Sequence, residues 1–319
     1  MTAMKMLVTT ALQRDPARFA ELERQHGVQI VVPPKGEPTA PLMADVDAVY
    51  GQLTADEFAN ARQLRWVQSP SAGVEWMWRV PRLADSDIVV TNMRGAHAAT
   101  IAEHTFALLL AQTRGLRSFM QFQQDHQWGR GELPLKAIKG LTMGIVGFGN
   151  IGRAIARRAT GFEMRVLAVD AERVPAGEGV AEVWPLSRLD ELCRESDVLA
   201  IAAPITPSSR GMIGRDQIRQ LKRGAYVLQM SRGGIINEAA LVDALEEGHL
   251  AGAGLDVTET EPLPVGDPLW TAPNVIITPH SSAASQLTWD LVWSILSENL
   301  GRFVRGEPLI NQVDKRRGW

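Results

Sequence analysis

Short apolar runs alternate with amphipathic stretches along the first part of the chain. Within residues 1–99, the apolar runs predict short strands at residues 28–32, 48–50, 64–68 and 88–91. Helical patterns separate these runs, which is typical of a small doubly wound α/β domain. Residues 98–117 then show helical periodicity without proline and predict one continuous helix, long enough to bridge two domains.

The same alternation continues through the second half of the chain. Further strands are predicted at residues 142–146, 164–169, 198–201, 225–228, 252–256 and 275–277. Helical patterns separate them, so this half predicts the parallel sheet of a Rossmann domain. A long helix is predicted at residues 287–304, and a polar tail follows it.

The strand predicted at residues 142–146 leads into a G-x-G-x-x-G loop that opens directly into a helix. Gly147 permits a tight turn, Gly149 lets the backbone approach a pyrophosphate, and Gly152 lets the helix pack closely on the strand. The next strand ends at Asp170, 18 residues after Gly152, close to the spacing of roughly 20 expected for an acid that binds the adenosine ribose. A carboxylate there repels a 2′-phosphate, so the sequence favours NAD(H) over NADP(H), although the nearby Arg173 would soften this preference.

Composition and charge narrow the class of protein. The 319 residues are enough for two domains, and the 45% hydrophobic and 22% charged content is ordinary for a globular protein. The net charge of −3 and the absence of long single-sign runs give no reason to expect a nucleic-acid or membrane partner. No signal peptide, membrane span or metal site is expected, and the single Cys193 is expected to be a buried structural thiol. These features predict a cytoplasmic protein.

One of the six histidines follows a predicted strand at a carboxyl end of the sheet. This is His280, whereas His26, His104, His126 and His249 are expected to be structural or solvated. Residues 229–234 and 256–262 also follow strands, and ligands of open α/β sheets bind at such carboxyl ends. All three segments are therefore expected to reach one pocket. From the residues alone, an alternative remains in which Arg232 and Glu261 form a structural ion pair and His280 caps a helix.

Several motifs occur in a characteristic order. They are Gly147–Gly152, Pro204–Pro207, Ser231–Gly234, Leu255–Val257 with Glu261–Leu263, and Thr278–His280. Together they resemble the D-isomer-specific 2-hydroxyacid dehydrogenases over most of residues 90–311. The resemblance implies that His280 is the general acid in reduction, that Glu261 fixes its tautomer, and that Arg232 binds the substrate carboxylate and carbonyl oxygen.

The resemblance also implies a larger set of binding residues. Backbone N–H groups of Ala72, Gly73 and Val74 would hold the substrate carboxylate. The implied cofactor contacts are Gly147, Gly149, Asn150, Ile151, Gly152, Asp170, Ala203, Met230 and Asp256. The chain departs from the family pattern at His97, Gln229 and Thr258, without loss of a catalytic group. Core or dimer packing is expected for most of the tryptophans near these segments. Trp76 or Trp293 would trim or stack on the substrate if either faced the pocket.

The resemblance implies a fold and an activity. We expect a Rossmann NAD-binding domain at residues 100–287, inserted into a flavodoxin-like substrate domain made of residues 1–99 and 288–319. The expected activity is NAD(H)-dependent interconversion of a small 2-oxo acid, such as glyoxylate or hydroxypyruvate, and a D-2-hydroxy acid by a homodimer. The alternatives are an NAD-sensing corepressor-like protein and a formate or phosphite dehydrogenase. Glu261 argues against formate, since the formate enzymes carry Gln there.

Overall fold

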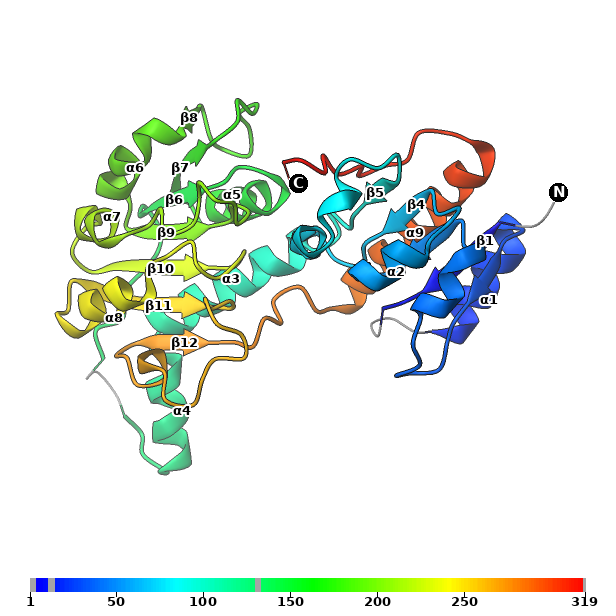
Figure 1. Cartoon of the computed structure of the whole chain (residues 1–319). Coiled ribbons are helices and arrows are strands. Elements are labelled where there is room, and N and C mark those ends of the chain that lie inside the picture. The colour runs from blue at the N-terminus through cyan, green and yellow to red at the C-terminus, as the bar shows by residue number, and fades with distance from the viewer. Residues whose placement is uncertain (1–3, 11–14, 130–132, 318–319) are drawn as a thin grey trace. The chain divides into compact units, whose positions relative to one another are not determined.

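The chain is organised as two compact units. The computed structural model describes residues 4–10, 15–129 and 133–317. One unit comprises Met1–His97 and Ser285–Trp319, and the other comprises Ala98–Ala284. The first unit is therefore discontinuous in sequence, and the second is inserted into it (Figure 1).

Among its described residues, the discontinuous unit contains five parallel strands in the order β2-β1-β3-β4-β5, which is the flavodoxin-like order. The strands are β1 (Lys5–Val8), β2 (Gln29–Val31), β3 (Ala48–Tyr50), β4 (Trp66–Gln68) and β5 (Val89–Thr91). The α-helices are α1 (Pro16–His26), α2 (Ala55–Asn60) and α9 (Gln286–Arg305). The C-terminal tail joins this sheet, because Gln312 forms a β-bridge with Thr91 and the Val313 N–H donates to the Val90 carbonyl.

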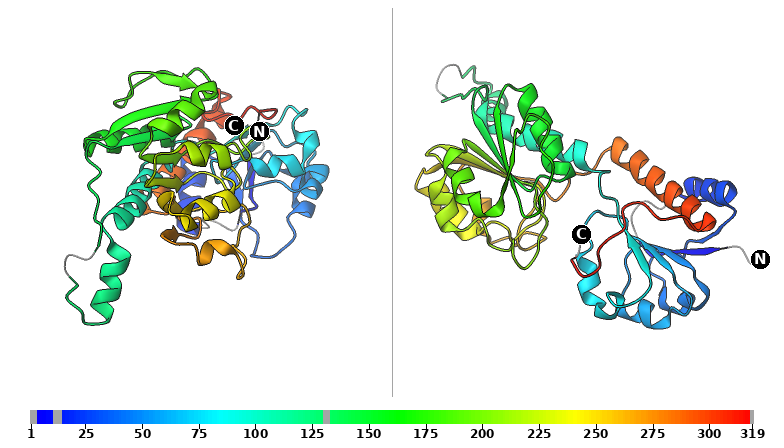
Figure 2. Two further views of the ribbon diagram at one scale, coloured as in Figure 1. Left: turned by 90° about the vertical axis from the view of Figure 1, so that its left-hand side faces the viewer. Right: turned by 90° about the horizontal axis from the view of Figure 1, so that it is seen from above.

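Helices α1 and α9 lie side by side on one face of this sheet (Figure 2). Between them, the rings of Phe19 and Trp293 meet edge to face, with their centroids 5.1 Å apart. Trp76 is also buried, in the cluster on the opposite face that contains Leu83. Both tryptophans are therefore core side chains of this unit, whereas Trp78 is exposed.

The inserted unit contains seven parallel strands in the order β12-β11-β10-β9-β6-β7-β8. The strands are β6 (Thr142–Val146), β7 (Arg165–Asp170), β8 (Val183–Pro185), β9 (Val198–Ile201), β10 (Ala225–Gln229), β11 (Leu250–Leu255) and β12 (Val275–Ile277). The order reverses at β6, as in a Rossmann sheet with one added strand. The prediction of an α/β protein with two parallel sheets is confirmed.

Helices cover both faces of the seven-stranded sheet. On one face lie α3 (Ala98–Thr113) and α5 (Asn150–Gly161), and on the other lie α6 (Leu189–Glu195), α7 (Arg215–Gln220) and α8 (Glu238–Glu246). Strands covered on both sides read as continuous apolar runs, which explains why they could be found in the sequence. Cys193 on α6 is fully buried, as predicted. No helix in the described ranges is long and apolar enough to cross a membrane.

The predicted helix at residues 98–117 is wrong in one respect. The structure breaks it into α3, which ends at Thr113, and α4 (Leu116–Gln124). Gly115 lies between them with a φ of 62°, a left-handed conformation that interrupts a helix and that glycine adopts without strain. Strands β1 and β8 were not among the strands predicted above.

Candidate active site

The glycine loop connects β6 to α5. Gly147 has a φ of 92°, and a Cβ at this position would lie 2.6 Å from the Ala203 backbone nitrogen. A Cβ on Gly152 would lie 2.1 Å from the Gly147 carbonyl oxygen. A Cβ on Gly149 would meet nothing within 4 Å. The first and third glycines are therefore required by packing within the protein, whereas the second leaves open space above the loop.

The N-terminus of α5 faces this open space without a capping side chain. Its N-cap is Gly149, and in the described part of the chain the N–H groups of Asn150, Ile151 and Gly152 have no protein acceptor. Free N–H groups and the helix dipole suit a phosphate. The site therefore fits the pyrophosphate of a dinucleotide.

Asp170 lies beside the glycine loop at the end of β7. Its Oδ2 accepts a hydrogen bond from the Phe148 N–H at 2.6 Å, and its Oδ1 accepts one from the Glu172 N–H at 2.9 Å. The carboxylate is thus fixed next to the loop and remains partly exposed. Ala203 follows β9 and Met230 follows β10, and both are buried at the same carboxyl edge of the sheet.

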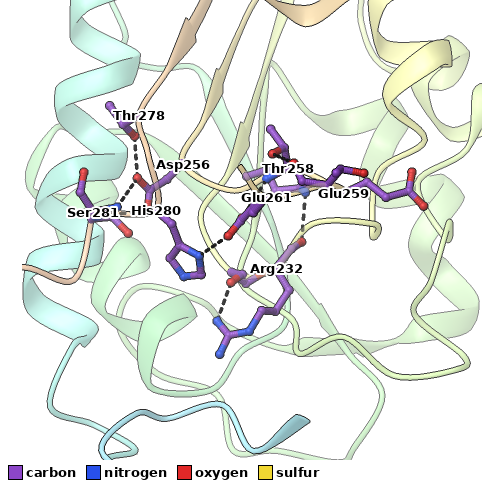
Figure 3. A network of polar contacts seen from close by, with 12 residues as sticks. Arg232, Asp256, Thr258, Glu259, Glu261, Thr278, His280 and Ser281 are labelled. Atoms are coloured by element: carbon purple, nitrogen blue, oxygen red, sulfur yellow. Dashed lines mark hydrogen bonds and ion pairs between the residues drawn. The ribbon is translucent and has the colours of Figure 1, made fainter. Parts of the chain in front are cut away.

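His280 and Glu261 form a hydrogen-bonded pair. The His280 Nδ1 lies 2.8 Å from the Glu261 Oε2, and both side chains are partly exposed, at 45% and 38% (Figure 3). An ionised carboxylate only accepts hydrogen bonds, so it selects the tautomer with a proton on Nδ1. The ring then presents Nε2 to a ligand. The pairing gives Glu261 a partner other than Arg232, and His280 does not cap α9, whose N-cap is Ser285.

The loop that carries Glu261 is held by its own backbone. The Thr258 N–H donates to the Glu261 Oε1 at 3.2 Å, and the Thr258 hydroxyl donates to the Thr260 carbonyl at 2.9 Å. The Glu259 N–H donates to the Glu238 Oε1 at 2.6 Å. Burial raises the pKa of the Glu238 carboxyl. The Thr258 N–H therefore fixes the orientation of the Glu261 carboxylate, and the other two hydrogen bonds fix the loop that carries Glu261.

Asp256 anchors the segment that carries His280. Its Oδ1 accepts hydrogen bonds from the Thr278 hydroxyl at 2.6 Å and the Ser281 N–H at 2.9 Å (Figure 3). Its Oδ2 accepts one from the Ser282 N–H at 3.0 Å. The backbone N–H of His280 donates to the Asp256 carbonyl at 2.8 Å. Thr278 was named above only as part of the Thr278–His280 motif, and Ser281 and Ser282 were not predicted, although hydroxyl residues on both sides of a candidate histidine were a visible signal.

Arg232 follows β10, and its loop packs against the loop of Glu261. A Cβ on Gly233 would lie 1.8 Å from the Thr258 carbonyl oxygen, so only glycine permits this approach. The Gln229 Nε2 donates to the Arg232 carbonyl at 3.0 Å. Arg232, Glu261 and His280 therefore lie together at the ends of three adjacent strands (Figure 3). Within the described residues, the buried Gln229 Oε1 and Ser231 Oγ have no hydrogen-bond partner.

The predicted substrate loop follows β4 in the discontinuous unit. The Ala72 carbonyl accepts a hydrogen bond from the Asn92 Nδ2 at 2.8 Å, and the Gly73 carbonyl accepts one from the Ser71 hydroxyl at 2.8 Å. In the described ranges, the N–H groups of Ala72, Gly73 and Val74 have no protein acceptor. Such a turn, with its carbonyls engaged and its donors available, suits an anion.

The described residues contain no cluster of three or more His, Cys, Asp or Glu side chains that could hold a metal ion. The glycine loop, α5 and Asp170 provide a surface that fits a bound dinucleotide.

Comparisons with known proteins show which family this chain resembles. Residues 106–282 match the family model of the "D-isomer specific 2-hydroxyacid dehydrogenase, NAD binding domain". Over 294 residues the chain is 38% identical to a glyoxylate reductase of Korarchaeum cryptofilum. The match covers 89% of this chain and 87% of that relative.

Two solved structures show the same likeness over nearly the whole chain. A family protein from Aeromonas salmonicida is 30% identical, with a TM-score of 0.86 and coverage of 98% of this chain and 100% of that one. One from Xanthobacter autotrophicus, in complex with NADPH and MES, is 28% identical, with a TM-score of 0.82 and coverage of 99% and 100%.

Proposed function

Because the chain belongs to the D-isomer-specific 2-hydroxyacid dehydrogenase family, we propose that it reduces a small 2-oxo acid to a D-2-hydroxy acid with NADH. The observation that carries this proposal is the hydrogen bond of 2.8 Å between His280 and Glu261. The reaction adds a hydride to the carbonyl carbon and a proton to the carbonyl oxygen. The protein therefore has to supply a proton donor, and the pair is suited to that role.

His280 is the proton donor in this proposal. The bound nicotinamide supplies the hydride. The Nε2 of the imidazolium donates its proton to the carbonyl oxygen as negative charge develops there, and the ring becomes neutral with its remaining proton on Nδ1. Glu261 keeps that proton in place and stabilises the imidazolium before transfer. In the reverse direction, neutral His280 accepts the hydroxyl proton.

Arg232 holds the substrate carboxylate in this proposal, and the loop at Ala72–Val74 is a second proposed carboxylate-binding group. A guanidinium presents a planar fork of donors that matches a carboxylate and the neighbouring carbonyl oxygen. In the other unit, the available N–H groups of Ala72, Gly73 and Val74 are backbone donors that also suit a carboxylate. Both sets of donors select 2-oxo acids over simple aldehydes and ketones.

The dinucleotide lies on the glycine loop in this proposal. The pyrophosphate would be held by the residues of this loop, which are Gly147, Gly149, Asn150, Ile151 and Gly152. Ala203 and Met230 contribute backbone contacts. Asp256 is the proposed partner of the nicotinamide carboxamide. Its Oδ2 accepts one hydrogen bond from the protein and can accept a second. Because its side chain is fully buried, this contact requires a local rearrangement when the cofactor binds.

The proposed preference for NAD(H) rests on Asp170. Its carboxylate is fixed by the N–H groups of Phe148 and Glu172, where it can accept hydrogen bonds from ribose hydroxyls and repel a 2′-phosphate. The relative from Xanthobacter autotrophicus was solved with NADPH, so the preference has to be measured on this chain.

We further propose that the protein is a cytoplasmic homodimer. None of the residues of α4 is buried, and its apolar Leu116 and Met120 are exposed at 47% and 62%. An apolar helix face of this kind is stabilised by burial in an interface. The free, buried thiol of Cys193 suits a reducing compartment.

A substrate panel tests the proposed function. NADH and NADPH oxidation is followed by absorbance with glyoxylate, hydroxypyruvate, pyruvate, phenylpyruvate and branched 2-oxo acids. We expect turnover with NADH and the smaller acids. Tight NADH binding without turnover of any acid would instead support the corepressor-like alternative, and formate-dependent NAD⁺ reduction would support the formate branch.

A further inference from the structure

Helix α3 places His104 against the segment that carries His280. The His104 Nε2 lies 2.9 Å from the Thr278 hydroxyl oxygen and 3.8 Å from the Asp256 Oδ1. The side chain of Asp256 is fully buried, and that of His104 is 23% exposed. His104 is therefore separated from the buried carboxylate by one hydroxyl group.

The hydrogen bonds of Asp256 determine which group is the donor in each contact between His104, Thr278 and Asp256. Asp256 accepts from Thr278, Ser281 and Ser282 and acts throughout as an acceptor. The single hydroxyl proton of Thr278 is therefore committed to Asp256. A hydroxyl has only one proton, so its oxygen must accept from the histidine. His104 consequently carries a proton on Nε2.

The Asp256 carboxylate in turn sets the geometry of His280. It holds the N–H groups of Ser281 and Ser282, while the Asp256 carbonyl holds the N–H of His280. His280 has a φ of 50°. A positive φ is uncommon for a residue with a side chain, and it persists where the surrounding contacts hold the backbone in place. Rotation of the Asp256 carboxylate would release the backbone on the C-terminal side of this strained residue.

We propose that His104 is a positioning residue for proton transfer. Its Nε2–H donates to the Thr278 hydroxyl, which orients the Asp256 carboxylate. That carboxylate holds the N–H groups of Ser281 and Ser282. These two bonds fix the backbone next to His280, whose Nε2 is thereby directed toward the substrate oxygen. The proposal rests on the proposed reductase function. In this proposal His104 contacts neither substrate nor cofactor, and it acts only by donating a hydrogen bond to Thr278.

Two substitutions of His104 separate hydrogen bonding from packing. His104→Leu removes the donor, and we expect kcat to fall about tenfold, the usual effect of one hydrogen bond expressed in a rate. KM for the 2-oxo acid should stay within about twofold, because His104 contacts no part of the substrate in this proposal. His104→Gln keeps an N–H donor at a similar distance and should retain kcat within about threefold.

A double-mutant cycle tests whether His104 acts through Thr278. Thr278→Val should lower kcat, and adding His104→Leu to it should lower kcat no further, since the route is already broken. Additive losses in the double variant would overturn the proposal. So would wild-type kcat in His104→Leu, or a loss in His104→Gln as large as in His104→Leu.

A matched control excludes a general effect of losing a half-buried imidazole. His249 is also partly buried, and its Nε2 is hydrogen-bonded to the Ile218 carbonyl at 3.0 Å. His249→Leu should leave kcat within about twofold of wild type. Thermal unfolding of every variant identifies any that fail to fold, and His104→Gln keeps the comparison available if His104→Leu does.

A spectroscopic measurement tests the proposal without relying on turnover. In protein labelled with ¹⁵N-histidine, the signals of His104 are assigned by their loss in His104→Gln. We expect the tautomer protonated at Nε2, and a change of these signals in Thr278→Val. Protonation at Nδ1 alone would contradict the proposed direction of donation, whereas an inactive wild type with the expected tautomer would contradict only the proposed function.

Discussion

The Nδ1 of His280 lies 2.8 Å from the Oε2 of Glu261, although 19 residues separate the two along the chain. The pair is assembled by adjacent strands, because Glu261 follows β11 and His280 follows β12. The Thr258 N–H orients the glutamate, and Asp256 holds the histidine segment. The geometry of the pair is therefore a consequence of sheet order and of loop hydrogen bonds.

The Asp170 carboxylate determines the choice of dinucleotide in our account. Asp170→Ser should lower kcat/KM with NADH and raise it with NADPH, which shifts the ratio of the two about tenfold or more, as expected for hydrogen bonds to a charged group. The measurement is steady-state kinetics with both cofactors. Glu172→Gln, a neighbouring exposed change, should leave the ratio unchanged. An unaltered ratio in Asp170→Ser would remove Asp170 from cofactor selection.

Arg232 should be sensitive even to a substitution that keeps its charge. Arg232→Lys loses the planar fork, so kcat/KM for the 2-oxo acid should fall about 10- to 100-fold. Kd for NADH, measured by fluorescence, should stay unchanged. Arg210→Lys is the control, because Arg210 is largely exposed and lies near Glu259 rather than the pair. Equal kcat/KM in Arg232→Lys and wild type would contradict bidentate substrate binding.

The thiol of Cys193 should be unreactive in the folded protein. Burial raises the pKa of Cys193 to about 12, so the nucleophilic thiolate is scarce at pH 8. We expect no reaction with a chromogenic disulfide reagent under native conditions and one equivalent of thiol after unfolding in urea. Rapid native labelling with loss of activity would show that Cys193 is accessible and would contradict its structural role.

His26 should contribute to the pH dependence of stability. Burial and then the nearby Arg305 guanidinium lower the pKa of His26, so the unfolded chain binds a proton more readily than the folded one. The contribution of His26 to the free energy of unfolding is present above about pH 6.5, the pKa of histidine in the unfolded chain. It is lost as the pH falls toward the lower pKa of His26 in the folded protein. Urea unfolding should therefore show that the midpoint difference between wild type and His26→Gln decreases from pH 7.5 to pH 5. A difference that grows on acidification would have the wrong sign.

The sequence was most informative where a local pattern determines the structure. The glycine loop was recognisable because the tight turn at Gly147 and the close packing at Gly152 can each be satisfied only by glycine. The break at Gly115 was missed, since an isolated glycine inside an apolar periodic segment does not by itself show which way the chain turns.

The less predictable features depend on contacts between distant segments. His104 was expected to be structural or solvated, and its hydrogen-bond partner Thr278 lies 174 residues away. The alternatives for Trp293 were a core or a pocket position, and contact with Phe19 places it in the core. Neither contact follows from the local spacing of residues around it.

The most direct test of the account is the effect of Glu261→Gln on turnover. The substitution keeps the shape of the side chain but removes the anion that fixes the His280 tautomer. We expect kcat for the best 2-oxo acid to fall at least about a hundredfold, with NADH binding unchanged. Glu259→Gln, in the same loop and exposed, should stay within about twofold of wild type. A Glu261→Gln protein that turns over at the wild-type rate would contradict the proton-transfer role of the His280–Glu261 pair.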